Sequence, residues 1–328
     1  MKLIVYIRSS GPNVNRKNLK DTLISFSEKN KEIDYKFYLI IENEHLDFVK
    51  DLFTNEIGDD KLLHIKTSEW DSNTPNQKTW AEDFNLFLKE HGETSEWLLI
   101  SHDDVLYVTD DYFKKMIEPV VDIQDSIGWM VSTNEQYYKN MIDDNCNIIS
   151  SSNGNYCRLV FDHLRPGNHP DHDKYPLMFH LHNGAVNYPE KPVLIHGPQS
   201  PVMLIPMKSM ITIGECENWS EYTMMVDEDW SLRALQNNLR NVWIPSVHHL
   251  HPLRPEEIKA GHRGVDVCHA NFKEKWGFDT GNDDDPYGCS IPVDELREKY
   301  KGTLIPWSTY RNSYDWEYVE DLKEELSK

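Results

Sequence analysis

A short acidic segment follows an apolar run near the end of the first third of the chain. Residues 97–100 are Trp-Leu-Leu-Ile, and Ser101 leads directly into His102, Asp103 and Asp104. Carboxylate oxygens are favoured ligands of hard divalent cations, and a cation held this way can bridge two phosphate groups as a Lewis acid. The same pattern also fits an ordinary solvated turn after a strand. The segment is therefore a candidate metal site whose meaning depends on where the fold puts it.

A second acidic group opens a later stretch of helical periodicity. Asp227, Glu228 and Asp229 are consecutive, and Arg233 follows one helical turn after Asp229. Crowded carboxylates raise one another's pKa towards the range of a useful general base, and the helix dipole offsets part of their repulsion. An ordinary acidic first turn with an Asp229–Arg233 ion pair fits the same residues. Both interpretations stay open on this segment alone.

Histidines gather behind a short apolar run that ends near residue 244. His248, His249 and His251 lie within four positions, and a Lys-Trp-Gly segment follows at 275–277. Imidazole can ligate a divalent metal or donate to a phosphate oxygen. A single histidine is more often a surface or core residue, and for His248 we expect that role.

The elements that must position these residues alternate between strand and helix. Short apolar runs predict strands at 2–8, 35–41, 62–66 and 97–100, with amphipathic helices between them at 19–26, 46–53 and 80–88. Further runs predict a strand at 201–206, a helix at 226–239, a strand at 241–244 and a helix at 255–276. Apolar strands alternating with helices indicate a parallel sheet covered on both faces. Because such sheets bind ligands beyond the carboxyl ends of their strands, the segment at 102–104 is well placed for binding.

Taken together, these features resemble the family-2-like inverting glycosyltransferases of the GT-A fold, over most of residues 1–280. The segment ending at Asp104 resembles the family's metal-binding D-x-D motif, here with His102 in the first place. The resemblance assigns Asp104 to the metal. It assigns Asp103 to the ribose or to the metal's water molecules.

The same resemblance covers the later motifs. Residues 227–233 are similar to the family's E-D-x-x-L-x-x-R segment, read with fewer residues between the acidic pair and the arginine. On that reading Asp229 is the general base that deprotonates the acceptor. His251 matches the histidine that reaches the metal or the diphosphate, with His249 as the second choice, and 275–277 matches the closing K-W-G segment.

Several residues are predicted to contact the donor nucleotide. Where relatives have an Asp-rich turn after the second strand, this chain has Glu42 and Asn43, either of which could accept an N–H group of the base. Asn85 resembles a family asparagine near the nucleotide, and Asp83 fits that position almost as well. With His102 and Asp103, these side chains form the predicted nucleotide site.

The resemblance implies an α/β chain with a GT-A (Rossmann-like), mostly parallel sheet and helices on both faces. We expect a transferase domain over 1–280, with a nucleotide-binding half at 1–105 and an acceptor half at 106–280. Long loops at 132–200 would belong to the acceptor half, and 281–328 would be a C-terminal extension. The implied activity moves a sugar from a nucleotide sugar, with a UDP-sugar as the first choice. Its acceptor would be a hydroxyl group of a glycan or glycoconjugate, and its cofactor Mn²⁺ or Mg²⁺.

Composition argues against other classes of partner. The net charge of −21 disfavours nucleic acid and anionic membranes, since both bind through clustered Lys and Arg. Five cysteines without a C-x-x-C pair argue against a disulfide framework or a cysteine zinc site and favour a reducing compartment. With no long apolar run and no signal-peptide pattern, the sequence predicts a cytoplasmic protein without an integral membrane segment.

Two other functions fit some of the residues. His169 and Asp171 form an H-x-D pair, which with a later histidine and Arg254 would suit a mononuclear iron oxygenase that uses 2-oxoglutarate. That chemistry is usual on a β-barrel, whereas the N-terminal half reads as alternating strands and helices. A non-catalytic carbohydrate-binding protein on a transferase fold is the other alternative, because tryptophan and tyrosine side chains stack on sugars as readily as they fill cores.

Overall fold

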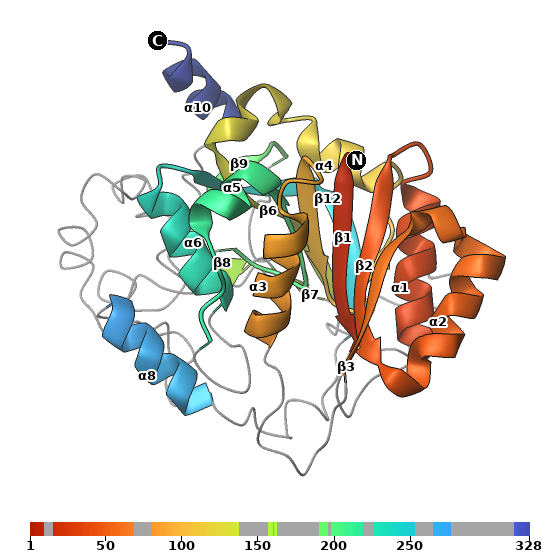
Figure 1. The fold of residues 1–328 in the computed structure, drawn as a ribbon. Coiled ribbons are helices and arrows are strands. Elements are labelled where there is room, and N and C mark those ends of the chain that lie inside the picture. The colour runs from red at the N-terminus through yellow and green to blue at the C-terminus, as the bar shows by residue number, and fades with distance from the viewer. Residues whose placement is uncertain are drawn as a thin grey trace.

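The computed structural model of the chain describes residues 1–9, 16–68, 80–137, 157–159, 161–162, 190–195, 198–218, 226–252, 265–276 and 318–328. In these ranges the chain forms one large sheet with helices on both faces (Figure 1). None of the described helices combines the length and the apolar character that crossing a bilayer requires.

The sheet has the spatial order β3–β2–β1–β4–β11–β6–β12–β5, with β7 paired to β6 and β9 paired to β12. The strands are β1 (Leu3–Ser9), β2 (Tyr35–Glu42), β3 (Leu62–Ser68), β4 (Trp97–Ser101), β5 (Leu106–Tyr107), β6 (Ile127–Tyr137), β7 (Cys157–Leu159), β9 (Val193–Ile195), β11 (Val202–Pro206) and β12 (Arg240–Pro252). A separate two-stranded sheet pairs β8 (Phe161–Asp162) with β10 (Pro198–Gln199). The first four strands of the order are parallel, and antiparallel β11 joins them to the parallel β6–β12 pair.

The helices are α1 (Arg16–Lys29), α2 (Leu46–Leu52), α3 (Trp80–His91), α4 (Tyr112–Ile117), α5 (Met207–Ile213), α6 (Val226–Gln236), α8 (Val265–Trp276) and α10 (Val319–Leu326). Alternation along β1 explains how the sheet is covered. Leu3, Val5 and Ile7 belong to one buried cluster with α1, α2 and α4, whereas Ile4 and Tyr6 belong to another with α3, α5 and α6. Successive strand residues point to opposite faces, so a run that is apolar throughout requires helices on both sides. Figure 1 shows α1 and α2 on one side of β1–β3 and α3 on the other.

The predicted strands and helices occur in the predicted order, but β5, β6, α4 and α5 were not predicted, and one predicted strand is longer in a way that matters for the site. The strand predicted at 241–244 continues as β12 to Pro252, after a register shift against β6 between Ile244 and His248. The sequence suggested an end near Pro245, because proline removes a backbone donor. Pro245 lies within the register shift, so the strand continues past it. His248, His249 and His251 therefore lie on β12.

Only parts of the predicted loops at 132–200 and of the predicted extension at 281–328 lie among the described residues. The region 132–200 was expected to be loops, yet its described parts include the end of β6, all of β9 and three further short strands. Most of the remaining region lies outside the described residues, as does 281–317. The described end of the predicted extension packs on the main domain: Val319 and Leu322 join its core, and Lys323 pairs with Asp122 at 2.7 Å.

Candidate active site at the carboxyl edge of the sheet

The carboxyl ends of β1 and β4 lie side by side, and the acidic segment begins there. Ile7 is the register partner of Ser101, the last residue of β4, and β1 continues beyond it to Ser9. The backbone N–H of His102 then donates to Pro201, at 2.9 Å, which fixes the turn against β11. After this turn β5 pairs with the far end of β12, through Leu106 and Leu250. Because of this pairing, the end of β12 lies close to the turn of 102–104.

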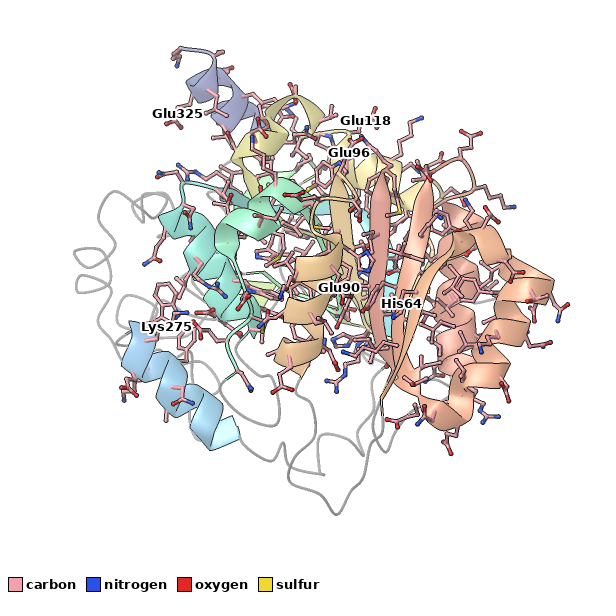
Figure 2. The ribbon with its side chains drawn as sticks, in the orientation of Figure 1. His64, Glu90, Glu96, Glu118, Lys275 and Glu325 are labelled. Carbon is pink, nitrogen blue, oxygen red and sulfur yellow. The ribbon has the colours of Figure 1, made fainter. Side chains whose placement is uncertain are left out.

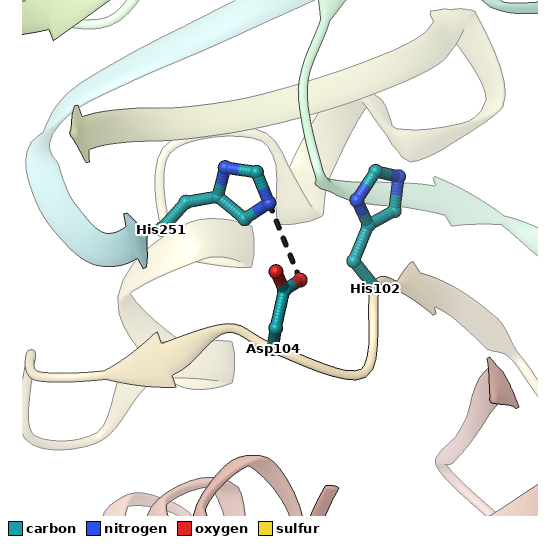
Figure 3. Close-up of side chains that lie close together, drawn as sticks. All are labelled: His102, Asp104 and His251. Carbon is teal, nitrogen blue, oxygen red and sulfur yellow. Dashed lines mark ion pairs between the residues drawn. The ribbon is translucent and has the colours of Figure 1, made fainter. Parts of the chain in front are cut away.

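Three side chains meet at this turn: His102, Asp104 and His251 (Figure 3). Their ligand atoms all lie within 4.8 Å of one another. His251 Nε2 is 3.2 Å from Asp104 Oδ1, and the two imidazole rings are 5.5 Å apart between centroids. Asp104 is buried and His102 is exposed, so the group lies at the surface end of a buried turn.

The chemistry of these donors fits a divalent transition metal. Two imidazole nitrogens and one carboxylate would fill part of a coordination shell and leave positions for oxygen atoms of a ligand. Imidazole suits transition metals better than it suits Mg²⁺, which favours oxygen. The structure thus brings together two residues predicted for the metal, Asp104 and His251, and one predicted for the nucleotide, His102.

Asp103 and His249 lie beside this group without belonging to it. Asp103 Oδ2 accepts a hydrogen bond from Ser9 Oγ at 2.6 Å, which ties the acidic turn to the end of β1. His249 is fully buried, and its Nδ1 lies 2.7 Å from Ser132 Oγ, which in turn lies 2.5 Å from the hydroxyl of Tyr112. Burial, followed by the neighbouring histidines, holds the pKa of His249 well below its usual value. His249 is therefore a core residue that contacts Ser132, which favours His251 as the ligand.

A cavity of about 360 Å³ opens next to the metal-competent group. It extends from the acidic turn across β11 to the first turn of α6. Its described wall contains Arg8, Trp80, Ile100, Ser101, His102, Asp103, Ser200, Pro201, Met203, Val226 and Asp227. One space therefore connects the turn of 102–104 with the second acidic segment.

Asp227 is the carboxylate of that second segment that faces the cavity. It is half-buried, and it is the second residue of α6. Burial, and to a smaller extent the charge of Glu228, raises the pKa of Asp227 well above its ordinary value of 3.8. A raised pKa brings a carboxylate closer to the basicity that proton abstraction near neutral pH requires.

Asp229 has a different environment from Asp227. It is 2% exposed, and its carboxylate is surrounded by three donors. Arg233 Nη2 lies at 2.7 Å, Lys275 Nζ at 2.7 Å and Trp276 Nε1 at 2.9 Å. Lys275 and Trp276 belong to α8, which lies beside α6 (Figure 2). Asp229 thus joins the two helices, and it is absent from the described cavity wall.

The remaining residues predicted for the nucleotide fall at two other places. Glu42 ends β2, and Asn43 begins the short helix after it; neither is on the described cavity wall. Both amide atoms of Asn85 bond the backbone of Cys216, at 2.9 and 2.7 Å. Asn85 therefore anchors the segment after α5. Asp83, the alternative to Asn85, is buried between Arg8 and Lys66.

Two residues of this site were not predicted from the sequence in the roles they occupy. Arg8 was interpreted only as the end of the first strand. Asp227 was treated as a neighbour of the base, because the family pattern was read with a gap. Counted back from Arg233 without a gap, the E-D-x-x-L-x-x-R spacing places its aspartate at Asp227. That spacing was the signal that could have identified it.

Comparisons with known proteins identify the fold. No protein-family model matches the sequence, and no curated protein matches it. Among solved structures, GalNAc-T7 with UDP, GalNAc and Mn²⁺ aligns with a TM-score of 0.58 and 12% identity, covering 99% of this chain and 57% of that one. *S. aureus* TarS 1-349 in complex with UDP-GlcNAc aligns with a TM-score of 0.50 and 11% identity, covering 94% of this chain and 69% of that one. The chain has the GT-A glycosyltransferase fold.

The shared GT-A fold confirms the predicted architecture. It also removes the premise of the oxygenase alternative, because the described strands form an open sheet and not a barrel. His169, Asp171 and Arg254, on which that alternative depended, lie outside the described residues. The chain spans just over half the length of GalNAc-T7. At these identities the likeness establishes the fold alone.

Proposed function

We propose that the protein is a metal-dependent glycosyltransferase that moves a sugar from a UDP-sugar to a hydroxyl group of a glycan or glycoconjugate. The observation that supports this most directly is that one cavity extends from His102 to Asp227. A transferase needs to hold the leaving nucleotide at one end of such a space and activate an acceptor at the other. Both solved structures of this fold contain UDP or a UDP-sugar, which supports uridine as the base.

The donor end is formed by His102, Asp104 and His251. A divalent cation on these ligands would neutralise charge on the diphosphate leaving group. Asp103, held by Ser9, lies on the cavity wall at the same end and is placed to accept hydrogen bonds from donor hydroxyl groups. Holding the donor in one orientation supplies much of the rate of a reaction between two bound substrates.

The acceptor end is formed by the start of α6. In the proposed mechanism Asp227 takes the proton from the acceptor hydroxyl while that oxygen attacks the anomeric carbon opposite the leaving group. A single displacement of this kind inverts the anomeric configuration. Asp227 lies on the cavity wall, which favours it as the base over Asp229. The carboxylate of Asp229 pairs with Arg233 and with Lys275 of α8. The inversion can be read from the product by proton NMR.

Comparing Asp227→Asn with Asp229→Asn tests the assignment of the base. A base contributes mainly in the transition state, so its loss lowers kcat more than donor affinity. We expect Asp227→Asn to lower turnover of UDP-GlcNAc or UDP-GalNAc with Mn²⁺ by at least about 100-fold, the low end for general-base catalysis. Donor binding should stay near normal, and Asp229→Asn should keep most of the turnover at a temperature where it is folded.

Release of UDP measured for both variants distinguishes the two carboxylates. A larger loss of turnover in Asp229→Asn than in Asp227→Asn would restore the base predicted from the family pattern. Retention of the anomeric configuration would rule out single displacement by either residue. Tight UDP-sugar binding without turnover in the unmodified protein would instead support the non-catalytic carbohydrate-binding alternative.

The three possible metal ligands, His102, Asp104 and His251, also suit a second candidate function. Two histidines and one carboxylate with His-x-Asp spacing also form the facial triad of mononuclear iron oxygenases. The fold favours the transferase, but the two functions differ in one direct measurement. Iron-dependent consumption of 2-oxoglutarate, without UDP binding, would favour the oxygenase.

A further inference from the structure

A buried carboxylate and two partly buried cations form a cluster beside the cavity, on three different elements. Asp83, in the first turn of α3, is 2% exposed. Lys66 Nζ from β3 lies 2.9 Å from Asp83 Oδ1, and Arg8 Nη2 from β1 lies 3.7 Å from Asp83 Oδ2. One carboxylate thus faces two cations, one from β1 and one from β3.

Arg8 is the member of this cluster that reaches the cavity. Ile7 pairs with Ser101 in the sheet, so Arg8 lies beside the position of His102 at the carboxyl edge. Among the described residues of the wall, Arg8 is the one lysine or arginine. The single cation of the wall is therefore adjacent to the group that can hold a metal.

The two contacts of Asp83 differ in length. The Lys66 contact has hydrogen-bond length, whereas the 3.7 Å separation from Arg8 is too long for a hydrogen bond. Asp83 therefore attracts Arg8 by charge and not through a hydrogen bond. The guanidinium group of Arg8 presents several N–H donors in a plane, a geometry that matches phosphate oxygens.

We propose that Arg8 contacts the phosphate groups of the donor nucleotide, and that Asp83 positions it from behind. The inference rests on the proposed function, because it assigns the leaving diphosphate to this end of the cavity. Arg8 supplies positive charge beside the metal ligands, where the departing nucleotide gains negative charge. Asp83 does not touch the ligand; it lowers the cost of keeping Arg8 half-buried before the nucleotide binds.

The test measures the affinity of UDP, inorganic pyrophosphate and uridine by calorimetry, with Mg²⁺ or Mn²⁺, for the unmodified protein and Arg8→Gln. Loss of a hydrogen-bonded charge should weaken UDP and pyrophosphate by about tenfold or more and leave uridine unchanged. Lys66→Gln is the matched control: it removes one positive charge and one partner of Asp83 but is away from the described wall. Its affinities for UDP and pyrophosphate should change much less. If Arg8→Gln does not fold, Arg8→Lys keeps the charge and should show a smaller loss.

Each outcome separates this inference from the proposed function. Equal affinities of Arg8→Gln and the unmodified protein for UDP and pyrophosphate would overturn the role of Arg8 and leave the transferase proposal standing. Pyrophosphate binding that depends on Arg8, without UDP binding, would overturn uridine as the base and support the phosphate contact. An equal loss in Lys66→Gln would show that only the overall charge matters, which contradicts a contact by Arg8.

Discussion

At the scale of single residues, two carboxylates two positions apart have different environments. Asp227 faces the cavity, and Asp229 is enclosed by Arg233, Lys275 and Trp276. Consecutive acidic residues at a helix start are alike in sequence, but residues two positions apart on a helix point in different directions. The difference in environment gives each carboxylate its role.

The environment of Asp227 predicts how activity depends on pH. Since its pKa is raised, activity should be lost as the pH falls through a value above that of an ordinary aspartate. The neighbouring charge of Glu228 contributes to this shift, so Glu228→Gln should lower the pKa of Asp227. We expect the acid limb of the kcat/KM profile to move to lower pH in this variant. A limb that stays in place or moves to higher pH would exclude Asp227 as the titrating base.

The histidines of β12 give a second contrast between residues. His251→Ala should weaken Mn²⁺ binding by about tenfold or more, with little change in the free energy of unfolding, because this side chain is near the surface. His249→Ala should instead destabilise the fold by about 2 to 3 kcal/mol, since it leaves a buried cavity and removes the partner of Ser132. Manganese titration and urea unfolding of both variants check this. The reverse pattern would make His249 the ligand.

At the scale of elements, the contact between α6 and α8 depends on Asp229. Replacing it with asparagine leaves Arg233 and Lys275 without their shared carboxylate, and both are only partly exposed. Asp229→Asn should therefore lower the free energy of unfolding by about 2 to 3 kcal/mol. Asp227→Asn should lower it much less, because burial, which raises the pKa of Asp227, works against its charge and the amide removes that charge. Urea unfolding of the two variants at pH 7 measures the difference, and equal losses would contradict distinct roles.

Many of the strands and helices were predictable from the sequence, whereas contacts between distant segments were not. Apolar runs predicted β1–β4 and β11, because strands buried on both faces leave a strong pattern. The continuation of β12 past Pro245 was not predictable, since it depends on pairing with β6 and β5 across long sequence separations. That continuation decides which histidine reaches Asp104. The charge cluster of Arg8, Lys66 and Asp83 was missed for the same reason, because no local pattern joins three residues on separate elements.

At the scale of the whole molecule, the sheet brings all the proposed chemistry to one edge. The carboxyl ends of β1 and β4 contribute Arg8, Ser9 and the acidic turn, while β12 and α6 approach from the other half of the sheet. The net charge of −21 makes a cationic wall residue and a metal cation the natural means of attracting an anionic donor to this edge. The fold thus explains why residues more than a hundred positions apart act together.

The most direct test of the proposed function is calorimetry of UDP binding with Mn²⁺ and with a chelator, in the unmodified protein and in Asp104→Ala. A metal that bridges the protein and the diphosphate contributes several kcal/mol, so UDP should bind at least about tenfold more tightly with Mn²⁺. In Asp104→Ala the two affinities should be nearly equal. Equal affinity with and without metal in the unmodified protein would contradict a metal-dependent donor site at His102, Asp104 and His251.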